Sequence, residues 1–70
     1  MDIRLKEGED YIKLGQLLKL SGAASSGVEA KIYIIEGEVT VNGEAETRRG
    51  KKIYAGDTVD FRDYHIRVIA

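Results

Sequence analysis

The spacing of apolar residues predicts a first helix near the start of the chain. In residues 11–20 apolar side chains fall at positions 11, 14, 17 and 18, which form one face of an amphipathic helix. Asp10 is expected to cap this helix, and Ser21-Gly22 to end it. Gly15 costs about 1 kcal/mol of helix propensity relative to alanine. Its presence can instead indicate the close approach of another backbone segment.

A second helix is predicted over residues 26–36. Ser26 and Glu29 have the spacing of a capping box, and Gly37 suits the left-handed residue that ends a helix. Ala30 is small enough for a tight crossing with the first helix. Apolar residues recur at helical spacing, at Val28, Ile32 and Ile35. Because so few residues separate the two helices, we expect them to pack as a helical hairpin.

Strands are predicted in the remainder of the chain. Val39 and Val41 alternate with polar residues, and Asn42-Gly43 is the strongest short signal for a hairpin, with a return strand over residues 44–46. Further short strands are expected within residues 2–7, 53–54, 58–61 and 65–69. This order predicts an α+β fold, with a helical hairpin packed on a small antiparallel sheet.

Composition favours one folded domain over residues 1–70. The chain is 43% hydrophobic and contains no cysteine, which excludes disulfides and thiolate metal sites and fits a reducing compartment. The first residues contain no apolar signal segment, and no apolar run is long enough to span a membrane. We therefore expect a soluble cytoplasmic protein.

The distribution of charge is more informative than its sum. The net charge of −1 argues against a uniformly basic nucleic-acid binder. Residues 13–35, however, carry three lysines and one glutamate, and residues 44–54 carry four basic and two acidic side chains. A fold that brings these two segments together would form a basic patch.

Residues 26–43 resemble the alpha-L RNA-binding motif, the domain named after ribosomal protein S-four and found in pseudouridine synthases and tyrosyl-tRNA synthetases. The matching residues, in order and spacing, are Ser26, Ala30, Lys31, Ile34, Gly37, Val39, Val41, Asn42, Gly43, Gly56 and Asp57. The similarity extends from Tyr11 onward. Arg48-Arg49-Gly50-Lys51-Lys52 makes the chain most similar to small stand-alone bacterial members. One departure matters, because Gly27 occupies the position where the family usually has arginine.

The resemblance implies a non-catalytic module that binds structured RNA, with ribosomal or transfer RNA as the expected partner. Phosphate recognition needs surface cations, so the candidate RNA-binding residues are Lys31, Arg48, Arg49, Lys51 and Lys52. Lys13 and Lys19 are weaker candidates that lie off the apolar face of the first helix, and Tyr54 could stack on an unpaired base. The competing interpretation is that the charged loop is simply solvated.

No residue pattern indicates catalysis or a cofactor. His65 is the only histidine and has no cysteine or second histidine to complete a metal site or a catalytic pair. We therefore predict no enzyme activity, no metal and no cofactor, in a monomer. The alternative function is a protein-interaction adaptor. It is favoured by the net charge, by the glycine at position 27 and by an acidic first ten residues that could meet a basic protein.

Overall fold

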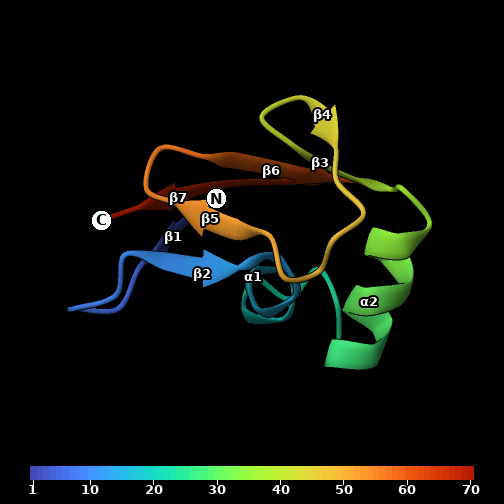
Figure 1. The fold of residues 1–70 in the computed structure, drawn as a ribbon, viewed down its shortest axis with the longest axis horizontal. Helices are drawn as coiled ribbons and strands as arrows, with labels where there is room; N and C mark the ends of the chain where they lie inside the picture. Colours follow the sequence, from blue (N-terminus) through green and yellow to red (C-terminus); the bar gives the residue numbers. More distant parts are fainter.

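The computed structural model describes all residues 1–70 and contains two helices and seven strands (Figure 1). In chain order they are β1 (Asp2–Arg4), β2 (Tyr11–Lys13), α1 (Leu14–Leu20), α2 (Gly27–Ile35), β3 (Val39–Val41), β4 (Glu44–Ala45), β5 (Lys52–Tyr54), β6 (Thr58–Phe61) and β7 (Tyr64–Ile69). The helices lie on one side of the main sheet. The predicted α+β class and helical hairpin are confirmed.

The main sheet has five strands in the order β1-β7-β6-β3-β4. Every neighbouring pair is antiparallel except β1 and β7, which run in parallel with Ile3 opposite Val68. The sheet is therefore mixed, and not purely antiparallel as predicted. Strand β1 is separated from β7 by nearly the whole chain, so no hairpin fixes its direction. Strands β2 and β5 form a separate two-stranded ribbon.

The prediction of one helix over residues 11–20 is wrong in its first turn. Residues 11–13 form β2, which pairs with β5, and α1 begins only at Leu14. Asp10 does not cap the helix. Instead, the N–H groups of Leu14 and Gly15 donate to the carbonyl oxygens of Lys51 (2.9 Å) and Arg49 (3.0 Å). Pairing with a distant strand thus outweighs the local helical spacing, and the same distant segment caps the helix.

The second helix has the predicted ends. The N–H of Glu29 donates to the Ser26 hydroxyl at 3.1 Å, but the Glu29 carboxylate accepts from the N–H and hydroxyl of Ser25 rather than from Ser26. At the other end Gly37 has a φ of +78°. Its N–H donates to Ile34, and the next N–H donates to Tyr33, which completes a Schellman motif.

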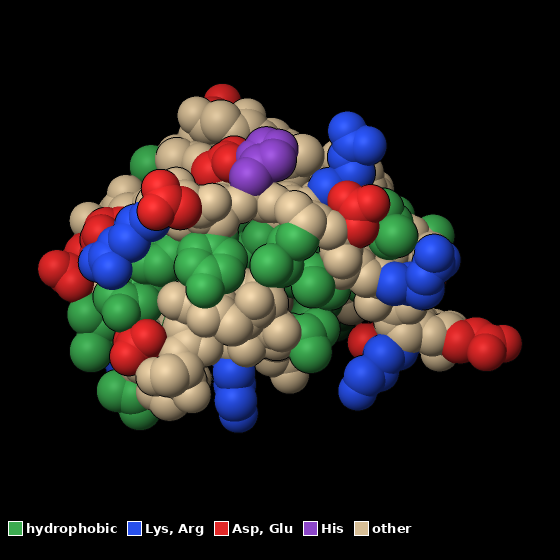
Figure 2. All heavy atoms as spheres, turned by 180° about the vertical axis from the view of Figure 1, so that it is seen from behind, with side chains coloured by type: hydrophobic (Ala, Val, Ile, Leu, Met, Phe, Trp, Pro, Cys, Tyr) green, Lys and Arg blue, Asp and Glu red, His purple; other side chains and the backbone are tan.

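Thirteen buried apolar residues form one core between the helices and the sheet. From the helices, Leu14, Leu17, Leu18, Ala30 and Ile34 contribute to it. Ala30 is fully buried, in agreement with the predicted tight crossing. The apolar series at helical spacing does not pack in the core, because Val28, Ile32 and Ile35 are 70%, 49% and 58% exposed. In Figure 2, hydrophobic side chains lie among acidic ones at the left of the molecule, where α2 is located.

The hairpin between β3 and β4 forms at the predicted residues. Asn42 and Gly43 have φ values of +51° and +85°, the combination that a type I′ turn requires, and Val41 lies opposite Glu44. Several strands differ by a few residues from the predicted ranges: β1 and β4 are shorter, and β7 begins at Tyr64. These differences leave the predicted order unchanged.

Candidate nucleic-acid interface

The two basic segments of the sequence lie side by side in the fold. Lys13 is the register partner of Lys52 in the β2–β5 ribbon, and Gly15 is hydrogen-bonded to Arg49. The loop between β4 and β5 passes the start of α1 (Figure 1). Cations that are far apart in sequence therefore share one region of the surface.

Three of the predicted cations surround a surface hollow at the start of both helices. We call it the helix hollow, and its lining residues are Lys13, Gly15, Gln16, Lys19, Gly27, Arg49 and Gly50. No acidic side chain lines it. Three of its seven residues are glycines, and at Gly27 and Gly50 an added Cβ would meet no atom within 4 Å, so a ligand can approach the backbone at these two positions. Gly27, which occupies the position where the alpha-L motif usually has arginine, thus lies in the same hollow as Arg49.

A second hollow lies along the basic loop. We call it the loop hollow, and it is lined by Arg48, Gly50, Lys51, Lys52 and Tyr54. Gly50 lines both hollows, so they are adjacent. Tyr54 is 47% exposed. The loop hollow therefore combines three cations with an accessible aromatic ring.

The basic side chains differ in the interactions that they make within the protein. Arg48 donates from Nε and Nη2 to the two carboxylate oxygens of Glu46, at 2.9 and 3.1 Å. These side-chain hydrogen bonds are the main reason that the pKa of Glu46 falls to about 2. Lys52 places its ammonium 5.0 Å from the centre of the Tyr11 ring. By contrast, Arg49, Lys13 and Lys19 form no ion pair in the structure.

The structure places Lys31 apart from the other candidates. Lys31 is exposed on α2, four residues after Gly27, and so on the same side of the helix one turn further on. It lines neither hollow. Of the eight predicted residues, the two hollows contain all except Lys31.

Sequence reasoning missed Gln16 as a member of the site. Gln16 and Lys19 lie three residues apart on one side of α1, and Lys13 immediately precedes the helix, at the end of β2. That spacing was a usable signal, although a neutral side chain does not appear in a search for charge.

The Asn42 and Asp57 side chains hold the region behind Tyr54 in place. Asn42 donates from Nδ2 to Asp57 Oδ1 at 3.0 Å, and Asp57 Oδ2 accepts from the Tyr54 N–H at 2.8 Å. The Asn42 Oδ1 accepts from the N–H of Thr58 at 2.9 Å. Two motif positions of the sequence therefore contact each other and fix the backbone that carries Tyr54.

Other candidate chemistry is not assembled in the structure. The His65 ring pairs with Asp60 on the exposed face of β6 and β7. No group of three or more histidine, cysteine, aspartate or glutamate side chains is arranged to hold a metal ion. Neither helix is long and apolar enough to cross a membrane.

Comparison with known proteins gives consistent matches over almost the whole chain. The model of the S4 domain family matches residues 3–69. YbcJ of Escherichia coli (strain K12) is 48% identical over 60 residues, which cover 86% of each chain. A Bacillus subtilis (strain 168) protein named "Probable ribosome maturation protein RlbA" is 46% identical over 55 residues, covering 79% of this chain and 78% of the relative.

A solved structure shows the same fold. The solution structure of YbcJ from E. coli, described as revealing an alpha-L motif involved in RNA binding, aligns with a TM-score of 0.73 and 43% identity. The alignment covers 99% of this chain and 86% of the YbcJ chain. The alpha-L resemblance inferred from residues 26–43 is therefore confirmed, and this chain belongs to the S4 domain family.

Proposed function

We propose that this chain is a non-catalytic RNA-binding module that holds the phosphate backbone of a structured RNA in the helix hollow. The observation that carries the proposal is the convergence of Lys13, Lys19 and Arg49 on one hollow that no acidic side chain lines. All three cations are free of ion pairs. The net charge of −1 is no obstacle, because local potential at a surface determines where a polyanion binds.

The chemistry of the helix hollow suits a paired RNA strand. Arg49 can donate two parallel hydrogen bonds to a phosphate, and the two lysines can neutralise neighbouring phosphates as point charges. Gln16 supplies an amide that can bond a phosphate or a 2′-hydroxyl, the group that distinguishes RNA from DNA. The relatives support this assignment: the YbcJ structure is described as revealing a motif involved in RNA binding, and the Bacillus subtilis relative is named as a probable ribosome maturation protein.

Salt dependence tests the electrostatic part of the proposal. With three phosphate contacts, one for each cation of the helix hollow, the logarithm of affinity for structured RNA should fall with the logarithm of salt concentration, with a slope of about −2 to −3. Arg49→Glu should weaken binding sharply and flatten the slope. Arg67→Glu makes the same charge change at an exposed residue of β7 that lines neither hollow, and serves as the control. Equal losses in the two variants would exclude the helix hollow as the site.

A protein-interaction role remains the second candidate, and one observation favours it. Val28, Ile32 and Ile35 form an exposed apolar row on α2, opposite the buried Ala30 and Ile34. Glu29 and Glu36 lie seven residues apart along one side of this row, so a partner with a basic edge would fit it.

Measuring whether the protein retains total RNA at low ionic strength distinguishes the two functions. Retention of RNA supports the binding module, and its absence supports the adaptor. In the adaptor case Ile32→Gln should weaken partner binding, whereas Arg49→Glu should not. Cytoplasmic location and a monomeric state stay predictions in either case.

A further inference from the structure

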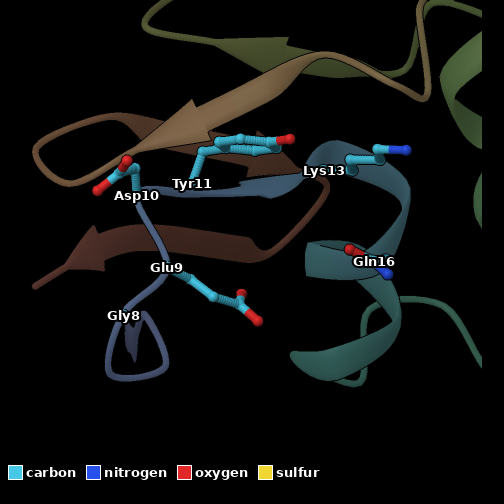
Figure 3. A pocket seen from close by; sticks show the side chains of 6 residues that line it. All are labelled: Gly8, Glu9, Asp10, Tyr11, Lys13 and Gln16. Carbon is cyan, nitrogen blue, oxygen red and sulfur yellow. The ribbon is translucent and has the colours of Figure 1, made fainter.

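The β2–β5 ribbon presents two matched pairs of side chains on one side. Tyr11 lies opposite Tyr54, and Lys13 lies opposite Lys52. Between these pairs, Ile12 and Ile53 face each other, and Ile53 is fully buried. Because successive side chains of a strand point to opposite faces, the tyrosines and lysines share the outer face. Figure 3 shows Tyr11 and Lys13 on the same side of β2.

The two tyrosines have different roles within this face. Their ring centres are 5.8 Å apart with an interplanar angle of 53°, and the Lys52 ammonium lies 5.0 Å from the Tyr11 ring. Tyr11 is half-buried, and its ring packs against both Tyr54 and Lys52. Tyr54 is 47% exposed and its backbone is held by Asp57. The ring of Tyr54 is therefore accessible to a ligand, and the contacts with Tyr11 and Asp57 restrict its position.

We propose that this platform of Tyr11, Lys13, Lys52 and Tyr54 binds an unpaired nucleotide, with its base stacked on Tyr54 and its phosphate in the loop hollow. This inference rests on the proposed RNA-binding function. The loop hollow joins Tyr54 to Lys51 and Lys52 and contains no acidic residue. An aromatic ring beside cations is the arrangement that recognises a base together with its phosphate.

The position of the platform defines the RNA structure that would fit. The loop hollow and the helix hollow share Gly50, so they are close enough for one RNA strand to contact both. The glycine-lined helix hollow suits a paired backbone, whereas stacking on Tyr54 requires a base released from its pair. The geometry therefore points to the junction between a duplex and an unpaired nucleotide. Stacking accepts any base, so the platform selects an RNA shape and not a sequence.

A pair of matched RNAs tests the platform. Both contain the same 12-base-pair duplex with a three-nucleotide unpaired extension, but in one RNA the extension is abasic. The number of phosphates is then equal, and the ratio of the two Kd values measures only the contribution of the bases. In the wild-type protein we expect the RNA with bases to bind at least about five-fold more tightly. Tyr54→Leu should bring the ratio close to one, and Tyr54→Phe should preserve it.

Each outcome decides between the two proposals. A wild-type ratio near one, with tight binding of both RNAs, overturns the platform and leaves the helix hollow as the RNA site. A ratio that stays high in Tyr54→Leu also overturns the platform, because the base must then stack elsewhere. Failure to bind either RNA overturns the proposed function together with this inference. If Tyr54→Leu proves unstable, Tyr54→Gln makes the same test, because the side chain of Tyr54 is 47% exposed.

Discussion

Gly15 donates its backbone N–H to the carbonyl oxygen of Arg49 at 3.0 Å, and this contact connects the first turn of α1 to the basic loop. The helix has seven residues and no side-chain cap at its start. The loop carbonyls therefore satisfy N–H groups that would otherwise lack a partner. The same hydrogen bond holds the backbone of Arg49 at the helix hollow, so the start of α1 and the geometry of the proposed phosphate site depend on one contact.

The two adjacent arginines of the loop should differ in their importance for RNA binding. Arg48 is paired with Glu46, whereas Arg49 is unpaired and lines the helix hollow. Arg49→Gln should therefore reduce affinity for duplex RNA several-fold more than Arg48→Gln, and should lower the magnitude of the salt slope by about one. Fluorescence anisotropy titrations at several salt concentrations measure both effects. Equal losses would contradict the predicted difference between the paired and the unpaired arginine.

Restoring the family's arginine at position 27 should strengthen RNA binding. A Cβ added at Gly27 meets no atom within 4 Å, and Gly27 lines the helix hollow together with Arg49. Gly27→Arg would add a fourth cation to that hollow. We expect tighter binding and a salt slope steeper by about one. Gly27→Gln tests whether the charge is responsible, and an equal gain from glutamine would exclude the electrostatic explanation.

The sequence predicted correctly those structural features that depend on residues close together in the chain. The Ser26 cap, the Gly37 stop and the Asn42-Gly43 turn depend on residues within a few positions, and all three form as predicted. Strand β2 was missed because it is three residues long and its partner strand lies about 40 residues away. No local pattern in so short a segment can reveal that pairing.

In the candidate site, too, individual residues could be predicted from the sequence, but their arrangement in space could not. α2 is apolar on two opposite sides, so periodicity could not choose between Val28-Ile32 and Ala30-Ile34 as the packed face. The basic residues were found from the distribution of charge along the chain and from the alpha-L resemblance. Their grouping into two hollows was not, because it depends on the β2–β5 pairing.

Acid titration should reveal the Glu46–Arg48 pair. The guanidinium of Arg48 lowers the pKa of Glu46 from 4.5 to about 2 in the folded protein. A carboxyl group whose pKa is lower in the folded state stabilises the fold above its unfolded pKa, and that contribution is lost as pH falls toward 2. NMR titration of the Glu46 side-chain carboxyl carbon should give a midpoint near 2. In Arg48→Met the midpoint should return part of the way to 4.5, since the Arg48 backbone N–H still donates to the carboxylate. An unchanged midpoint in Arg48→Met would contradict the pairing.

Replacing Gly15 by alanine should stabilise the protein. A Cβ at this position would lie 3.6 Å from the Cβ and the carbonyl oxygen of Arg49, which is ordinary van der Waals contact. The gain should be about 0.4–1 kcal/mol in the free energy of unfolding, because glycine is a poor helix former and gives the unfolded chain more freedom. Gly22→Ala is the matched control. It should be destabilising because Gly22 has a φ of +85°. Urea unfolding of both variants measures the difference, and destabilisation by Gly15→Ala would mean that the Arg49 contact tolerates no methyl group.

Asn42 should be the most sensitive turn residue, because its side chain connects two turns while its backbone has a φ of +51°. Asn42→Ala removes the hydrogen bonds to Asp57 and Thr58. Alanine also lacks the polar side chain that helps asparagine to adopt the left-handed region. We expect a loss of about 1–2 kcal/mol in the free energy of unfolding. Asn42→Gly loses the same hydrogen bonds but adopts this φ without strain, so its loss should be smaller. Equal losses in urea unfolding would assign the whole effect to the hydrogen bonds. In both variants the backbone N–H of Tyr54 should exchange faster with deuterium, because Asp57 would hold it less firmly.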